Sequence, residues 1–112
     1  MKALIFNEFG GPNVLKYEEI DDPIMDSKDL LVETKAVGLN FADIYRRKGN
    51  YHLEGNPPYI LGYEGAGVVK SIGNSVTNYK VGDRIGFADV PFSNAELVCV
   101  NEDKAIPIPD EI

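Results

Sequence analysis

The segment Ala36-Val-Gly-Leu-Asn-Phe-Ala-Asp-Ile-Tyr-Arg-Arg47 decides the interpretation of the fold, because the spacing of its side chains changes at Gly38. Over residues 30–37, successive side chains alternate between two faces, and this period of two predicts a half-buried β-strand. After Gly38 the apolar residues take the spacing of one stripe of a helix. The residues of this stripe are Phe41, Ile44 and Tyr45. We therefore expect a strand that is followed at once by a short helix.

The start of this helix carries two polar residues with defined roles. Asn40 is a favoured N-cap residue, and Asp43, three positions later, can turn back towards the cap. The charge of Asp43 also complements the partial positive charge at the helix N-terminus. Sites are commonly built where a strand ends beside a helix N-terminus. A well-capped connecting helix would show the same residues, and this segment alone favours that simpler interpretation.

Length and charge restrict the class of protein. The chain has 112 residues, which is enough for one domain but not for two. Its 44% hydrophobic and 26% charged residues are typical of a soluble globular domain. Asp and Glu outnumber Lys and Arg by 18 to 11, which gives a net charge of −7. A chain this acidic, with no basic stripe, is repelled by phosphate backbones, so we expect no nucleic-acid partner.

The same inventory argues against a membrane span and against a zinc site. No apolar run approaches the roughly 20 residues that cross a bilayer, and the apolar N-terminal stretch is too short for a signal peptide. The single cysteine, Cys99, cannot form an internal disulfide and fits a reducing cytoplasm. We interpret Cys99 as a small buried residue and the single histidine, His52, as a solvated loop residue. One Cys and one His cannot supply a four-ligand Cys/His zinc site.

Other parts of the chain predict short strands separated by turns. The predicted strands are residues 2–7, 14–20, 30–37, 68–72, a segment that follows the turn at 79–83, and 95–100. The first two are expected to pair across a turn at residues 10–13. Six or seven short strands with one short helix indicate a mostly β domain, a closed or partly closed barrel that hides its edges.

Three glycines, Gly62, Gly65 and Gly67, do not form a phosphate-binding loop. The dinucleotide fingerprint has another spacing and opens a helix, whereas here a strand follows. We expect these glycines where backbone or ligand comes close at a bend of the sheet. Residues 48–58 are rich in Gly and Pro and predict a long irregular loop, a kind of loop that is often functional. Residues 105–112 alternate Pro with Ile and predict an extended linker.

Four motifs occur in order and at familiar spacing. They are Gly38-Leu-Asn-Phe-Ala-Asp43, Leu61-Gly-Tyr-Glu-Gly-Ala-Gly-Val-Val69, Val81-Gly-Asp-Arg-Ile85 and Lys104-Ala-Ile-Pro-Ile-Pro109. With the Gly10-Gly11-Pro12 turn in front, they resemble the N-terminal domain of the medium-chain dehydrogenase/reductase superfamily. The resemblance is greatest to the zinc-independent NADPH:quinone oxidoreductases, which are zeta-crystallin-like, and it covers the whole chain.

The resemblance implies a GroES-like, mostly β, partly closed barrel over residues 1–112, with one or two short helices. In this family a Rossmann domain with the dinucleotide fingerprint comes next, and the chain then returns to the barrel. We expect residues 105–112 to begin the linker to that domain, which is absent from this chain. The isolated chain is then expected to be inactive.

Departures from the zinc-dependent branch of the superfamily bear on the chemistry. The positions that match Asn40 and Tyr63 are a zinc-binding Cys and a zinc-binding His in zinc alcohol dehydrogenases, and neither Asn nor Tyr is a usual zinc ligand. The lobe that holds a structural zinc with four Cys would fall near residues 87–94, where no Cys occurs. The carboxylate pair near that metal is retained as Asp43 and Glu64, which we expect to be mainly ordinary polar residues. No zinc is therefore expected.

The resemblance also implies roles for individual residues. Hydride transfer from NADPH to a quinone or a related α,β-unsaturated carbonyl leaves charge on an oxygen, which needs a hydrogen-bond or proton donor when zinc is absent. The candidate catalytic residues are Asn40, Tyr45 and Tyr51, and Tyr51 matches the proposed proton donor of related enoyl-thioester reductases. The predicted NADPH contacts are Phe41, Ala42, Asp43, Ile44 and Tyr45. Tyr63 and Glu64 are predicted to line the substrate cleft.

The expected partners are a small quinone or enone, and a second copy of the full-length enzyme in a cytoplasmic homodimer. Without its second domain, this chain is expected to expose the cleft and to self-associate through it. Two alternatives remain open from the sequence. One is an enoyl-thioester reductase on the same scaffold, and the other is a stand-alone GroES-like binding module.

Overall fold

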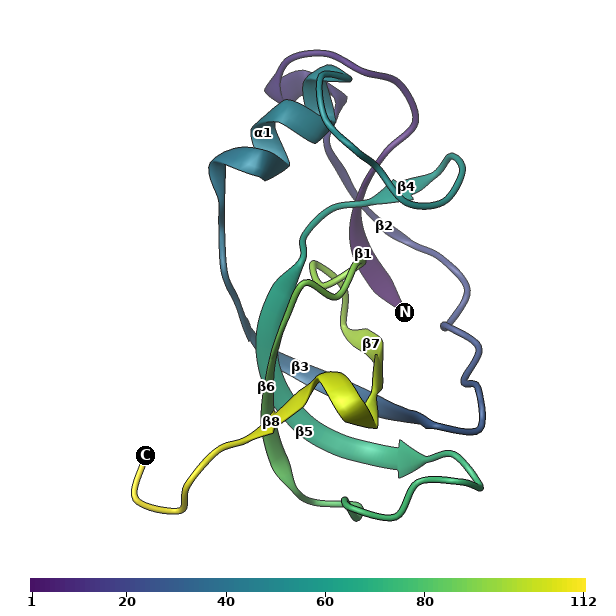
Figure 1. Ribbon diagram of the computed structural model, residues 1–112. Helices are drawn as coiled ribbons and strands as arrows, with labels where there is room; N and C mark the ends of the chain where they lie inside the picture. The colour runs from purple at the N-terminus through teal and green to yellow at the C-terminus, as the bar shows by residue number, and fades with distance from the viewer.

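The computed structural model describes residues 1–112 and shows eight strands, one α-helix and two short 3₁₀ helices (Figure 1). In chain order the elements are β1 (Lys2–Phe6), η1 (Pro12–Val14), β2 (Lys16–Glu19), β3 (Asp29–Val37), α1 (Phe41–Lys48), β4 (Tyr59–Ile60), β5 (Glu64–Ile72), β6 (Arg84–Ala88), β7 (Leu97–Asn101), η2 (Glu102–Lys104) and β8 (Ala105–Pro107). The helix α1 lies at one end of the molecule, and the C-terminal tail lies at the other (Figure 1).

The strands form two antiparallel sheets that curl into a half-barrel. One sheet has the order β2-β1-β4 and the other has the order β7-β3-β5-β6-β8. The two sheets meet where Ala3 forms a bridge with Ala95. The predicted fold class, a mostly β and partly closed barrel, is confirmed, and no Rossmann domain is present in these residues.

The centre of the larger sheet is β3, which pairs with β5 on one side and with β7 on the other. Leu30 and Val32 are fully buried, while Glu33 and Lys35 are exposed, as the alternation predicts for a half-buried strand. The main core cluster lies on this sheet and in the loop after β6: Leu30, Val32, Val69, Ile85, Phe87, Val90, Val98 and Val100.

Two of the glycines in β5 lie where strands come together with no room for a side chain. A Cβ at Gly65 would lie 2.7 Å from the carbonyl oxygen of Ala36, and a Cβ at Gly67 would clash with the carbonyl oxygen of Glu33. Both glycines lie in the strand and neither opens a helix. The expectation that these positions allow close approach of the backbone is confirmed.

Some predicted boundaries were wrong. The second strand is shorter than residues 14–20, because η1 places Val14 in a 3₁₀ turn, but its antiparallel pairing with β1 is as predicted. The short strand β4, which pairs with β1, was not predicted. Residues 105–107 are not a free linker, since they form β8 and pair with β6. As an edge strand, β8 tolerates Pro107, which has no backbone N–H to donate.

A buried carboxylate holds the loop between β5 and β6 in place. Glu102 is only 4% exposed, and its Oε1 accepts hydrogen bonds from the backbone N–H groups of Thr77 (3.2 Å) and Asn78 (3.1 Å). The Lys28 Nζ lies 3.5 Å from the other carboxylate oxygen. These hydrogen bonds and the Lys28 charge favour the ionised form and lower the pKa of Glu102.

Candidate functional site

The helix α1 is capped at both ends, and the cap at its start is the one that the sequence predicts. The backbone N–H of Asn40 donates a hydrogen bond to Asp43 Oδ2 at 3.0 Å, which is the backward turn predicted for Asp43. At the other end Gly49 adopts the left-handed conformation, with φ of 84°. Between these two caps the helix has eight residues, Phe41–Lys48, and they include every candidate site residue that belongs to a helix.

The buried face of α1 is polar, and its apolar stripe is exposed. Asp43 and Arg46 are the buried residues of the helix, and Arg46 Nη1 lies 3.4 Å from Asp43 Oδ1. Phe41 is 77% exposed, and Ile44 and Tyr45 are also exposed. An amphipathic helix normally turns its apolar side inwards. The reversed arrangement leaves an apolar surface available to another group.

Asn40 connects the start of α1 to the start of β5. Its side-chain Nδ2 donates a hydrogen bond to Glu64 Oε1 at 2.6 Å. The Glu64 side chain lies directly over Gly38, where no Cβ would fit. The backbone N–H of Glu64 in turn donates to the hydroxyl of Ser93, which is fully buried. Asn40 and Glu64 are therefore held together, and Asn40 retains an amide oxygen and a second N–H for other partners.

Two tyrosine rings lie against the guanidinium of Arg46, and a third tyrosine lies beside one of them. The central carbon of the guanidinium lies 3.6 Å from the centre of the Tyr63 ring and 4.9 Å from that of Tyr51. The rings of Tyr45 and Tyr51 are 6.5 Å apart. Tyr51 is 54% exposed, whereas the Tyr63 hydroxyl is buried without a hydrogen-bond partner. Burial raises the pKa of Tyr63, and the charge of Arg46 opposes this effect.

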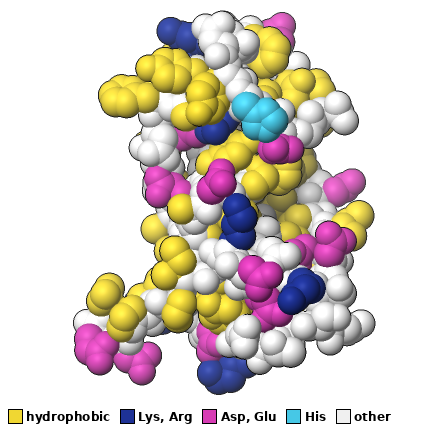
Figure 2. Space-filling model, viewed as in Figure 1, with side chains coloured by type: hydrophobic (Ala, Val, Ile, Leu, Met, Phe, Trp, Pro, Cys, Tyr) yellow, Lys and Arg dark blue, Asp and Glu magenta, His cyan; other side chains and the backbone are white.

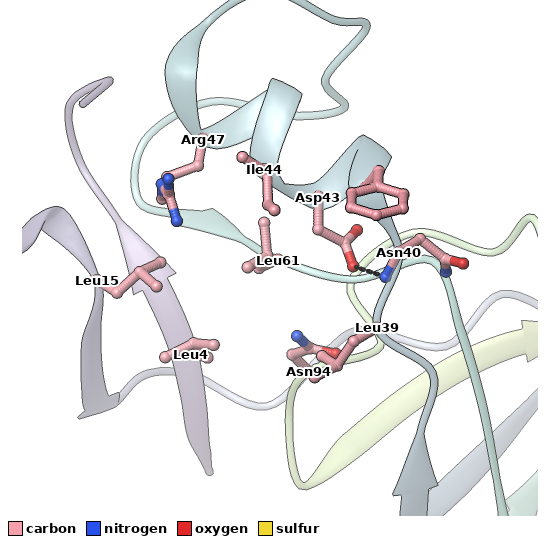
Figure 3. A pocket seen from close by; sticks show the side chains of 10 residues that line it. Leu4, Leu15, Leu39, Asn40, Asp43, Ile44, Arg47, Leu61 and Asn94 are labelled. Carbon is pink, nitrogen blue, oxygen red and sulfur yellow. Dashed lines mark hydrogen bonds between the residues drawn. The ribbon is translucent and has the colours of Figure 1, made fainter. Parts of the chain in front are cut away.

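A groove of about 610 Å³ runs along the other side of α1 (Figure 3). Asn40, Phe41, Asp43, Ile44 and Arg47 contribute from the helix or its N-cap, and the remaining lining residues are Leu4, Leu15, Leu39, Leu61 and Asn94. The exposed apolar side chains at this end of the molecule are also visible in the space-filling view (Figure 2). The structure thus places the predicted site residues on two sides of one short helix.

Two features of this region were not predicted. Arg46, in the middle of the tyrosine cluster, was not identified from the sequence, although an opposite charge three residues before it, at Asp43, is a known helix pairing signal. The leucines of the groove come from four separate segments, Leu4, Leu15, Leu39 and Leu61, so no local pattern groups them.

The remaining reactive residues lie outside this cluster. Cys99 is half-buried in β7, and burial raises the pKa of its thiol to about 11, with a smaller effect from Asp29 and Asp26. His52 is exposed, and its Nε2 lies 2.8 Å from Glu54. No three His, Cys, Asp or Glu side chains lie close enough together to hold a metal ion. None of the helices is long and apolar enough to span a membrane.

The sequence and the fold both indicate the protein family to which this chain belongs. The family described as the alcohol dehydrogenase GroES-like domain matches residues 26–110. The chain therefore belongs to this family, whose fold the half-barrel shows.

Several individual proteins that are similar to this chain are quinone oxidoreductases. The chain is 40% identical over 112 residues to the quinone oxidoreductase of Pseudomonas aeruginosa, a match that covers 99% of this chain and 34% of that protein. The solved structure of a quinone oxidoreductase from Pseudomonas syringae pv. Tomato DC3000 is similar with a TM-score of 0.93, 37% identity and coverage of 99% and 34%. The Escherichia coli quinone oxidoreductase complexed with NADPH has a TM-score of 0.93, 34% identity and coverage of 100% and 34%. The chain thus spans about a third of the length of these relatives.

Proposed function

We propose that this chain is the barrel domain of an NADPH-dependent oxidoreductase that reduces a quinone, or a related α,β-unsaturated carbonyl, without zinc. The observation that carries the proposal is the placement of hydrogen-bond donors at one helix: Asn40 is the N-cap of α1, and Tyr45 lies on α1 with the centre of the Tyr51 ring 6.5 Å from its own. The similarity to quinone oxidoreductases, one of them complexed with NADPH, supports the same function.

The chemistry requires a donor at the oxygen that gains negative charge. Preorganised donors at such a position are usually the largest single contribution to catalysis. Tyr63 is a poor candidate, because its hydroxyl is buried. Tyr51 is a better one, since its side chain is exposed and the Arg46 guanidinium lies 4.9 Å from the centre of its ring. Asn40 can donate its remaining amide N–H, and Tyr45 stands next to Tyr51 as a further candidate.

The exposed apolar stripe of α1 fits the flat face of a nicotinamide. Phe41, Ile44 and Tyr45 are exposed, and we propose that they contact the cofactor together with Ala42. Asp43 is buried and bonded to the Asn40 backbone and Arg46, so its role would be to hold the helix rather than to touch the cofactor. Bound NADPH would supply the hydride, and these side chains would orient the ring. The chain has no glycine-rich helix N-terminus for the phosphates, so other residues of a longer protein would hold them.

The residues at the positions that match zinc ligands support the proposed zinc independence. Asn40 donates its amide to Glu64, and Tyr63 stacks on Arg46, so both side chains already have partners of their own. We expect metal analysis of untagged protein to find no stoichiometric zinc. One tightly held zinc ion per chain would contradict the zinc-independent mechanism.

The activity can be tested in a chimera in which residues 1–112 replace the matching third of the Pseudomonas aeruginosa quinone oxidoreductase. We expect the chimera to oxidise NADPH with a quinone, and we expect the isolated chain to be inactive. A chimera that binds NADPH but reduces no quinone would contradict the proposal. Faster reduction of an enoyl thioester than of a quinone would favour the alternative substrate class.

The donor is tested in the same chimera by Tyr51→Phe, which removes only the hydroxyl. We expect kcat to fall by about ten- to a thousandfold, with little change in KM for NADPH. Tyr17→Phe is the matched control, because Tyr17 is an exposed tyrosine on β2 that is not part of the Tyr45–Tyr51 pair or of the contacts of Arg46. An unaltered kcat, with the chemical step limiting the rate, would exclude Tyr51 and leave Asn40, Tyr45 or a bound water as the donor.

A further inference from the structure

Arg46 is unusual among the cations of this chain, because it is buried beneath the candidate site. Its side chain is 10% exposed, whereas those of Lys28, Lys35, Lys80 and Lys104 in the other ion pairs are 49% to 83% exposed. Burying a guanidinium is costly unless hydrogen bonds and an opposite charge compensate for the lost water. The hydrogen bonds and the opposite charge that offset the burial of Arg46 therefore show which groups Arg46 holds in place.

Arg46 joins two segments by polar contacts, the start of α1 and the loop that follows the helix. Its Nε donates a hydrogen bond to the backbone carbonyl of His52 at 2.9 Å, which fixes the chain directly after Tyr51. Its Nη1 contacts Asp43 Oδ1, and the other oxygen of that carboxylate accepts the N–H of Asn40. Figure 3 shows this last hydrogen bond at the start of α1. One guanidinium therefore connects the helix N-terminus to the loop that carries Tyr51.

Two tyrosine rings lie close to the Arg46 guanidinium. Tyr63 stacks closely on Arg46, and the Tyr51 ring also lies within cation–π distance of it. The Tyr51 ring is otherwise half exposed and has only the Tyr45 ring as an aromatic neighbour. A lysine could supply the positive charge but neither the planar surface nor the forked donors.

We propose that Arg46 is a positioning residue that fixes the Tyr51 phenol relative to Asn40. It acts through the His52 carbonyl, the Asp43 carboxylate and its contacts with the Tyr51 and Tyr63 rings. The catalytic meaning of this position rests on the proposed function, in which Tyr51 is the donor. The position itself is a property of the chain and can be tested without activity.

The first test is NMR spectroscopy of the 112-residue chain with Arg46→Met and Arg46→Lys. We expect both variants to lose the nuclear Overhauser contact between the Tyr45 and Tyr51 rings and to shift the Tyr51 ring signals. The i,i+3 contacts that define α1 should remain. Lys48→Met, which removes an exposed charge two residues away, is the control and should leave the ring signals unchanged. Unchanged Tyr51 signals in a folded Arg46→Lys variant would overturn the proposal, even if Arg46→Met fails to fold.

The second test measures kinetics in the chimera described above. If Tyr51 is the donor, Arg46→Lys should lower kcat by about ten- to a hundredfold, because a small misplacement of a catalytic group is enough for such a loss. KM for NADPH should change less than about twofold, which a general loss of folding would not produce. If the Arg46 variants lose the ring contact but the Tyr51→Phe chimera is fully active, Arg46 positions Tyr51 and Tyr51 is not the donor. A ring contact that persists while kcat falls would instead overturn the positioning role.

Discussion

At the scale of single residues, Glu102 provides a prediction with a defined pH dependence. Its folded pKa lies below the ordinary value of 4.5, so its contribution to stability is fully present above that pH and is lost as the pH falls through the folded pKa. We expect Glu102→Gln to lower Tm by several degrees at pH 7, because the amide oxygen is a weaker acceptor for the N–H groups of Thr77 and Asn78.

The check is a series of thermal unfolding curves for both proteins from pH 7 to pH 3. The Tm difference between them should shrink as the pH falls below about 4.5. Glu111→Gln, an exposed carboxylate near the C-terminus, is the control and should change Tm little. A Tm difference that stays constant over the whole range would mean that the charge of Glu102 does not stabilise the fold.

Residues whose role is local were predictable from the sequence. The turn of Asp43 towards the N-cap follows from the spacing of Asn40 and Asp43, and the structure shows it. The environment of Arg46 was not predictable, because its partners Tyr51, His52 and Tyr63 come from a long irregular loop and from the residue before β5. Nothing in the local sequence indicates that such a loop folds back on the helix. Capping rules therefore predicted the start of α1 but not the contacts of Arg46.

At the scale of elements, the glycines of the larger sheet give a matched pair of substitutions. Gly67→Ala should destabilise the protein by about 3 kcal/mol or more, because the new methyl group clashes with the backbone of β3. Gly86→Ala on the neighbouring strand β6 meets nothing closer than 3.7 Å, and it should be neutral or slightly stabilising. Urea unfolding of both variants measures the difference. Equal stabilities would show that β3 and β5 can separate at no cost.

The elements that periodicity predicted are those with alternating burial. In β3 the alternation is visible in the sequence, and the strand was found within one residue at its start. The first half of β5 is rich in glycine and shows no such alternation, so only its second half was predicted. The two residues of β4 are too few to show an alternating pattern, and Pro107 argues against a strand at the position of β8. These strands exist because neighbouring strands offer them a partner, which is tertiary information.

At the scale of the whole molecule, the exposed apolar surface beside α1 predicts weak self-association. Leu39 is 79% exposed and lines the groove along the helix. The net charge of −7 opposes the contact between copies, so salt, which screens this repulsion, should strengthen it. We expect sedimentation velocity to show a dimer that increases with protein and salt concentration.

Leu39→Ser should reduce this dimer, because it removes apolar area from the groove. Ile24→Ser is the matched control, since Ile24 is 91% exposed but lies outside the groove. A chain that stays monomeric at every salt and protein concentration would contradict the prediction. Equal reduction by both substitutions would mean that association is not specific to the surface beside α1.

The place of β3 at the centre of its sheet has a consequence for synthesis on the ribosome. Leu30 emerges early, but one of its two partners, Val100, is translated about 70 residues later. The nascent chain must therefore carry β3 with one edge uncovered until β7 leaves the exit tunnel. Pairings so distant in sequence form slowly. The larger sheet is thus not complete before β7 has been translated, and until then the apolar strands of the core are exposed to chaperones.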